Sequence, residues 1–451
     1  GIAVQINLTE GNLLKVLAKF SVPFLVSSFL QTFYGLADLF ITGQFNGADV
    51  ITAVSVGSQL THMLTVIIVG LTMGSTVFIG KAVGEKDKER LEFGIGNIII
   101  LFAGFAVIAT AVLLIFTDGI VAMLETPAEA ELQTKYYLAI CFAGVPFIVA
   151  YNVIASIFRG LGDSRSPMYF VIIAGIINIL LDVLFIGPMD MKAAGAALAT
   201  IIAQAISVLA GVISLARKNR GFNLRRDNFR LNRRVFSDVI KVGVPVSLQD
   251  GLIQVSFLVI TIIANSRGVM TAAAVGIVEK IISFLFLVPS AMLSSISAIV
   301  AQNAGAGKHQ RSRLSLRYGI TITVVFGLFA AGMCQIFSEQ IVALFSSAEP
   351  QVITLGGQYL RAYALDCIFA GVHFCFSGYF CAYNKAIYSF IHNIVSIMLI
   401  RIPGTYIASV MFPDTLYPMG LAAPAGSLLS VVICTALYIL MQKKQASNNT
   451  L

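Results

Sequence analysis

Residues 93–117 read FGIGNIIILFAGFAVIATAVLLIFT, a stretch of 25 residues without a charged side chain. An α-helix of about 20 apolar residues is long enough to cross the hydrocarbon core of a bilayer. In lipid every backbone N–H and C=O group needs a partner within the protein, and a helix supplies those partners within one segment. The stretch therefore predicts a membrane-spanning helix.

The composition of the whole chain agrees with this stretch. Of the 451 residues, 57% are apolar and only 12% are charged, whereas a typical soluble domain is about a quarter charged. The mean hydropathy is +0.88, which excludes a soluble enzyme, a disordered chain and a disulfide-stabilised secreted domain. The six cysteines lie within apolar runs, so we expect neither disulfides nor a metal centre.

Eleven further stretches resemble residues 93–117 in length and apolar character. Together they predict an all-α integral membrane protein with twelve transmembrane helices. The expected spans are 16–42, 50–80, 93–117, 134–158, 166–187, 193–216, 236–264, 271–302, 317–338, 357–382, 387–412 and 419–441.

Lysine and arginine gather in alternate loops between these spans. Loops on one side carry 24 of the 30 basic residues, whereas the opposite loops carry only Lys135, Lys192 and Arg267. Because cytoplasmic loops are enriched in basic residues, we expect both termini in the cytoplasm and the protein in the cell (inner) membrane. The net charge of +8 is therefore explained by the basic cytoplasmic loops that set the orientation of the chain in the membrane. No nucleic-acid partner is expected.

The second half of the chain repeats the first at an offset of about 222 residues. The sequence KFSVP at 19–23 corresponds to KVGVP at 241–245, and TAVSVG at 52–57 corresponds to TAAAVG at 271–276. Such self-similarity indicates a duplicated fold.

Each half contains six spans, so both halves enter the membrane from the same side. This predicts two lobes related by a parallel pseudo-two-fold axis along the membrane normal, with substrate between them. We expect an N-lobe at 1–218 and a C-lobe at 219–451, linked by a basic cytoplasmic segment at 217–241.

Polar residues follow one face of the first span. Ser27, Gln31, Tyr34 and Asp38 have helical spacing, so their face must look into the bundle or a wet cavity. Pro23 removes a backbone hydrogen bond and can bend the helix. An acid within a span is costly and is by default a functional candidate, although static pairing of Asp38 is the alternative.

The fifth and sixth spans add further oxygen ligands. Asn178 and Asp182 are four residues apart and share a face, and Thr200 adds a hydroxyl group. With Asp38, these hard oxygens fit a proton or a small cation such as Na⁺ better than zinc or copper. The alternative is a hydrogen-bond network that only joins helices.

The second half has its own polar residues within spans. Asp250 and Gln254 lie on the seventh span, Glu279 on the eighth and Asp366 on the tenth. These side chains could contact a cationic substrate, and interhelical ion pairing is the alternative. No phosphate-binding loop, catalytic dyad or ATPase-sized soluble segment is found in the sequence, so we expect a non-enzyme that uses an ion gradient.

Several short motifs, in order along the whole chain, resemble those of prokaryotic multidrug and toxic compound extrusion (MATE) transporters. They include YGLAD at 34–38, FRGLGD at 158–163, QNAGAG at 302–307 and RIP at 401–403. The resemblance implies two six-helix lobes forming a V-shaped cleft. It also implies antiport of small organic cations against H⁺ or Na⁺ by alternating access, by a monomer without a cofactor.

The resemblance also implies roles for particular residues. Asp38, Asn178, Asp182 and Thr200 match the family's cation site in the N-lobe, and Tyr137 fits its fourth-helix tyrosine. The substrate-cavity candidates are Gln31, Tyr34, Asn152, Asp250, Gln254, Glu279 and Asp366.

Other functions are considered beside this one. A flippase for lipid-linked precursors, from the same superfamily, would need a cationic cavity for pyrophosphate, whereas acids outnumber bases within these spans. A channel or a membrane-embedded enzyme is a further alternative, and ion flux without substrate would indicate the channel.

Overall fold

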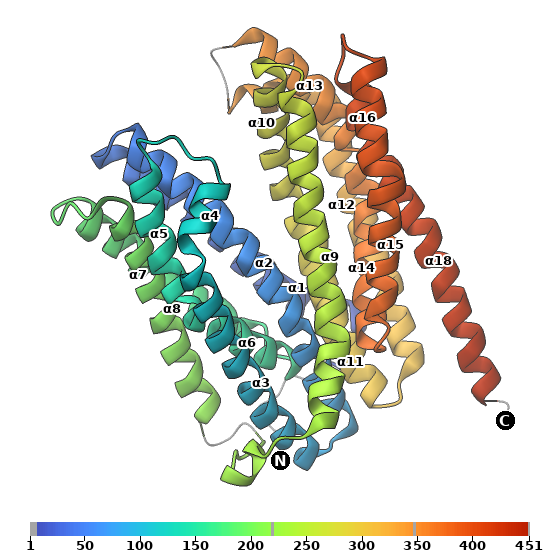
Figure 1. Cartoon of the computed structure of the whole chain (residues 1–451). Helices are drawn as coiled ribbons and strands as arrows, with labels where there is room; N and C mark the ends of the chain where they lie inside the picture. The colour runs from blue at the N-terminus through green and yellow to red at the C-terminus, as the bar shows by residue number, and fades with distance from the viewer. Residues whose placement is uncertain (1–6, 218–220, 346–348, 450–451) are drawn as a thin grey trace. The chain divides into compact units, whose positions relative to one another are not determined.

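The computed structural model describes residues 7–217, 221–345 and 349–449, in which all regular elements are helices (Figure 1). Ten helical segments of the described residues are long and apolar enough to cross a membrane, and two bent helix pairs bring the number to as many as twelve. The all-α membrane architecture expected from the sequence is therefore confirmed.

Packing divides the described residues into two compact units. The first unit contains residues 7–11, 18–217, 221–243 and 301–307, and the second contains the other described residues. The lobe boundaries expected from the sequence, at 1–218 and 219–451, stay a prediction.

The first unit is built from the helices that precede the middle of the chain. They are α1 (Leu13–Phe45), α2 (Ala48–Glu85), α3 (Lys88–Ile115), α4 (Thr117–Met123), α5 (Glu131–Ala143), α6 (Val145–Gly160), α7 (Arg165–Ile186), α8 (Lys192–Ala216) and the short 3₁₀ helix η1 (Arg226–Phe229). Within this unit α2 packs against α5 and α6, and α7 packs against α8.

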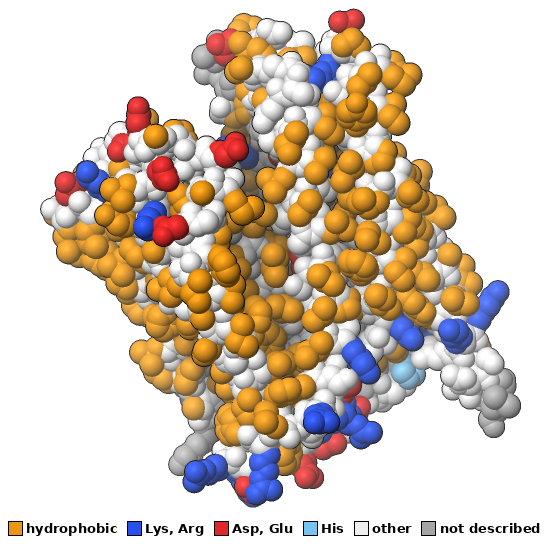
Figure 2. Space-filling view, viewed as in Figure 1, with side chains coloured by type: hydrophobic (Ala, Val, Ile, Leu, Met, Phe, Trp, Pro, Cys, Tyr) orange, Lys and Arg blue, Asp and Glu red, His pale blue; other side chains and the backbone are white. Residues whose placement is uncertain are grey.

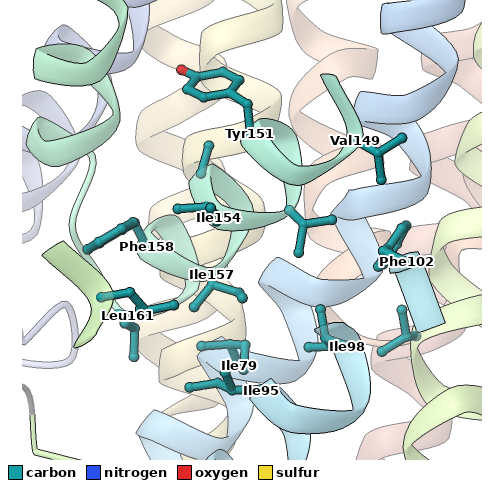
Figure 3. Packing of buried hydrophobic residues seen from close by; sticks show 14 of the residues in the cluster. Ile79, Ile95, Ile98, Phe102, Val149, Tyr151, Ile154, Ile157, Phe158 and Leu161 are labelled. Carbon is teal, nitrogen blue, oxygen red and sulfur yellow. The ribbon is translucent and has the colours of Figure 1, made fainter. Parts of the chain in front are cut away.

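The core of the first unit lies where α2, α3 and α6 meet. Ile79, Ile95, Ile98 and Ile157 are all buried, and Figure 3 shows their side chains among the same cluster. Small residues let these helices approach, because a Cβ atom at Gly160 would lie 2.7 Å from Ile79 Cβ. Such close packing is the main attraction between helices in lipid.

The second unit is built from the remaining helices, except that residues 233–243 of α9 and 301–305 of α11 belong to the first unit. They are α9 (Arg233–Asn265), α10 (Val269–Leu285), α11 (Leu287–Gly305), α12 (His309–Ala343), α13 (Pro350–Tyr363), α14 (Asp366–Ala382), α15 (Ala386–Ser396), the π-helical turn η2 (Ile397–Arg401), α16 (Ile402–Met411), α17 (Tyr417–Gly420) and α18 (Ala422–Asn449). Here α10 packs against α13, and α14 packs against α12 and α18.

The fourth expected span of each half is broken. The pair α5–α6 bends by 47° at Gly144, and the pair α13–α14 bends by 43° after Tyr363. The two breaks are separated by nearly the same offset as the repeated motifs. The sequence analysis gave continuous spans at 134–158 and 357–382, and it missed both bends because the apolar run continues through each of them.

Large apolar side chains cover the flanks of the helices. Figure 2 shows apolar side chains over the visible flanks and charged side chains mainly at helix ends. On α3, Val107 is 69% exposed and Ile108 is 66% exposed. Exposed apolar surface of this extent is what a bilayer covers, so the protein is a membrane protein.

We predict that Ile98→Ala lowers the free energy of unfolding by about 2 kcal/mol or more, because Ile98 is fully buried and the substitution leaves a cavity. Ile108→Ala on the same helix is the control. It should change the free energy of unfolding by much less, because lipid or detergent fills the space that the side chain leaves. Thermal unfolding in detergent micelles measures both. Equal losses would contradict the assignment of the core.

Candidate cation site

The predicted cation-site residues come from three helices of the first unit. Asp38 lies on α1, Asn178 and Asp182 on α7, and Thr200 on α8. Asn178 Nδ2 donates a hydrogen bond to Asp38 Oδ1 at 3.0 Å. Thr200 Oγ1 lies 3.5 Å from Asp38 Oδ2 and 3.1 Å from the carbonyl oxygen of Ala196, so both oxygens share its one hydroxyl hydrogen. Asp182 lies within hydrogen-bond reach of Asp38, so the structure brings all four residues together.

Acceptor oxygens outnumber donors in this cluster. Asp182 is fully buried, and neither of its carboxyl oxygens meets a donor among the described residues. The same holds for Asn178 Oδ1 and for Gln204 Oε1 on α8. Leaving a buried carboxylate without a donor or a counter-charge is costly. The donor set thus fits a shared proton or a small hard cation.

Tyr34 and Gly175 determine how closely α1 and α7 approach. A Cβ atom at Gly175 would lie 1.8 Å from ring atoms of Tyr34, so the ring fills the space that a larger residue would need. Asp38 is one turn beyond Tyr34, and Asn178 is about one turn beyond Gly175. The glycine therefore lets the helices meet at the level of the polar pair. The sequence analysis missed it, although its spacing from Asn178 was a signal.

Tyr137 lies on α5 and is buried, with its ring against Gly57 of α2. A hydrogen bond joins its side chain to that of Cys141. Asp38 and Asp182 both interact with Tyr137 electrostatically, so this residue lies near the cluster. Its role as a direct cation ligand stays a prediction.

The other candidates of the first unit have separate surroundings. Gln31 is exposed on α1. Asn152 on α6 is buried, and its Nδ2 donates to the carbonyl oxygen of Ile148 in its own helix at 2.8 Å. Pro23 lies inside α1, which runs from Leu13 to Phe45. The bending of α1 at Pro23 and the substrate roles of Gln31 and Asn152 stay predictions.

In the second unit, Asp366 and Glu279 share an arginine. Both interact electrostatically with Arg401, which donates to the hydroxyl group of Tyr363. The ring of Phe257 lies 4.9 Å from the guanidinium carbon of Arg401. Substrate contact and interhelical ion pairing, the two readings left open by the sequence, both stay predictions for Asp366 and Glu279.

Asp250 and Gln254 are half-buried on α9. The carboxyl group of Asp250 is hydrogen-bonded by Gln249, which in turn accepts a hydrogen bond from Ser389 on α15. Asp250 therefore joins a local network on its own part of the unit, and its contact with substrate, like that of Gln254, stays a prediction.

A sequence model of the MatE family matches residues 23–184 and 245–407. The chain belongs to the MatE family. The match covers both halves, and members of this family are transporters and not enzymes.

Two curated relatives and one solved structure show the extent of the similarity. The chain is 28% identical to the "Probable multidrug resistance protein YpnP" of Bacillus subtilis (strain 168), over 89% of this chain and 90% of that protein. It is 25% identical to an "FAD transporter" of Shewanella oneidensis, over 95% and 94%. Its fold matches that of a multidrug resistance MATE family transporter of the MOP superfamily, which was solved in an outward-facing conformation, with a TM-score of 0.90, 21% identity and 99% coverage of both chains.

We predict that Gly175→Ala lowers the free energy of unfolding by about 1–3 kcal/mol, because the ring of Tyr34 must leave its place. In the Tyr34→Ala background the same substitution should cost much less, which a double-mutant cycle measured by thermal unfolding reports. Gly35→Ala is the control, since no atom lies within 4 Å of a Cβ atom there. Additive effects of the two substitutions would contradict the proposed contact.

Proposed function

We propose that the protein exports organic cations in exchange for H⁺ or Na⁺, which binds at Asp38, Asn178, Asp182 and Thr200. The observation that carries the proposal is the buried Asp182 carboxyl group, which lies beside Asp38 and meets no donor among the residues that the structure describes. A proton or cation between the two carboxyl groups supplies the missing positive charge.

Binding of the ion acts on α1 through Asp38. The Asp38 carboxylate accepts hydrogen bonds from α7 and α8, so an ion that takes up these oxygens weakens the attachment of α1. Pro23 lacks an N–H group, and the missing backbone bond gives the helix a place to bend. Gln31 and Tyr34 lie between Pro23 and Asp38, so movement of this segment changes the walls of a substrate cavity.

Antiport requires that substrate and ion favour opposite states of the same element. An organic cation is attracted by the ionised carboxylates and is repelled once the ion has bound. The two ligands therefore compete, and the exchange drives alternating access. The monomer is the expected transporting form, because each chain contains both repeated halves.

The sign of the substrate charge follows from the same cluster. The names of several relatives refer to multidrug resistance or export, whereas one relative is named for transport of FAD, an anionic molecule. In this chain the polar face of α1 carries an acid and no base between Pro23 and Phe45. This favours cations, and nothing in the comparisons supports the lipid-precursor flippase.

We predict that Asp182→Asn and Asp38→Asn each reduce gradient-driven efflux of a fluorescent organic cation from proteoliposomes to the background level. The amide keeps the shape of the side chain but cannot provide the charge that holds the ion. Proton and Na⁺ gradients are imposed separately, so the gradient that drives wild-type efflux identifies the coupling ion.

The matched control is Asp118→Asn. Asp118 is exposed and forms an ion pair with Lys135 at 2.8 Å, and its removal should leave efflux unchanged because surface pairs contribute little. Uphill export at the wild-type rate by Asp182→Asn protein would contradict the assignment. Wild-type protein that responds to neither gradient would contradict the proposed antiport.

A further inference from the structure

Residues 221–234, which we name the basic strap, connect the end of α8 to the start of α9. The strap is attached to α3 by Asn97, which lies nine residues after the first residue of that helix. Asn97 Nδ2 donates to the carbonyl oxygen of Asn228 at 3.4 Å, and Asn97 Oδ1 accepts from the backbone N–H of Asn232 at 2.8 Å. Asn97 is fully buried and Asn228 is 4% exposed, so these contacts fix the middle of the strap.

Three further contacts hold the strap in place. A Cβ atom at Gly96 would lie 2.2 Å from the carbonyl oxygen of Asn228, so the two backbones touch. The N–H group of Asn223 donates to Glu92 Oε1 at 3.0 Å. Phe222 is buried in the core cluster of the first unit. The strap is therefore an ordered part of this unit, and its exposed side chains form a surface of defined shape.

The strap lies near the end of a membrane-spanning helix. Asn97 is nine residues from Lys88, the first residue of α3, which is about 13 Å along the axis at 1.5 Å per residue. Figure 1 shows η1 beside this end of α3. The headgroup region extends roughly 5–8 Å beyond the hydrocarbon on each side of a bilayer. The strap contacts Glu92, just before the apolar run at 93–117, and Asn97, just inside it. The strap is thus at the boundary between the lipid headgroups and the hydrocarbon.

The exposed side chains of the strap are of two kinds. Five arginines face outward, against a single acid, Asp227; they are Arg225, Arg226, Arg230, Arg233 and Arg234. Between them lie exposed apolar side chains: Leu231 is 73% exposed, Phe229 is 40% exposed and Leu224 is 37% exposed. Figure 2 shows basic side chains gathered at this end of the first unit.

We propose that the basic strap is a binding site for anionic phospholipid headgroups. Arginine presents N–H groups in a planar fork that fits the oxygens of a phosphodiester, and clustered basic residues at the end of a span attract anionic lipid. Phe229 and Leu231 enter the boundary between headgroups and acyl chains, as the apolar residues of interfacial segments do. A soluble polyanion would need the arginines alone, whereas here apolar side chains lie among them.

A single tryptophan tests this proposal directly, because the chain has none. Leu231→Trp protein is reconstituted into bilayers of phosphatidylcholine, with or without phosphatidylglycerol. Tryptophan emission should move to shorter wavelength when phosphatidylglycerol is present. Brominated phosphatidylglycerol should quench it more than brominated phosphatidylcholine at the same bromine content. Phe229→Trp provides a second reporter if the first variant does not fold.

The charge dependence is tested by adding Arg225→Gln, Arg226→Gln and Arg230→Gln to the reporter. Each substitution should lower the preference for anionic lipid about fivefold. High salt should also lower this preference in the protein that keeps all its arginines. Lys443→Gln with Lys444→Gln, at the end of α18, removes two charges elsewhere and should leave the preference unchanged.

Met123→Trp is the control reporter. Met123 is 84% exposed on α4, near acidic residues, and its emission should not depend on phosphatidylglycerol. Equal quenching of the strap reporter by both lipids would overturn the proposal, as would a preference that survives loss of the three arginines. A response to soluble heparin but not to phosphatidylglycerol would also overturn it, in favour of a soluble partner.

Discussion

The first unit depends on how it accommodates the carboxyl group of Asp182, which is buried next to Asp38 without a donor among the described residues. In a medium of low dielectric this arrangement requires a positive charge or a shared proton. The surrounding residues do not supply it: Asn178 donates to Asp38, and the hydroxyl group of Thr200 is shared between Asp38 and the carbonyl oxygen of Ala196. This excess of acceptor oxygens is the basis for the proposed ion site.

The packing around the cluster keeps this arrangement in place. Gly175 admits the ring of Tyr34, and Gly57 admits the ring of Tyr137. At both positions a glycine lets an aromatic side chain lie directly against a neighbouring helix. Close packing thus fixes the separation of the helices, and the hydrogen bonds of Asp38 determine their attachment. In the proposed mechanism, an ion at the site changes the hydrogen bonds of Asp38 and leaves the close packing in place.

The sequence indicated much of this architecture in advance. Uncharged apolar runs predicted the spans, and helical spacing placed Asn178 and Asp182 on one face, because both follow directly from the geometry of an α-helix. The shared chemistry of their oxygens, and then the resemblance to a known family, linked them to Asp38 and Thr200, which lie on other helices. Helical spacing alone could not do this, since it gives directions within one helix and not distances between helices.

The features that were missed all depend on contacts between distant segments. The bend at Gly144 occurs within an apolar run that continues through it. The approach of Tyr34 to Gly175 joins residues 141 positions apart in the sequence. The fastening of the strap to Asn97 gives an asparagine within an apolar run a partner that local patterns do not identify. In each case the sequence contains the glycine or the asparagine, but it does not identify the distant segment that this residue contacts.

The central claim is that the Asp38–Asp182 pair binds an ion that competes with a cationic substrate. Calorimetric titration of an organic cation into the purified protein tests it most directly, in buffers of different ionisation enthalpy and with or without Na⁺. The account predicts that binding releases protons, so that the heat depends on the buffer, or that Na⁺ weakens binding. Either effect should be absent in Asp182→Asn protein. Binding that is independent of buffer and of Na⁺ would contradict the account.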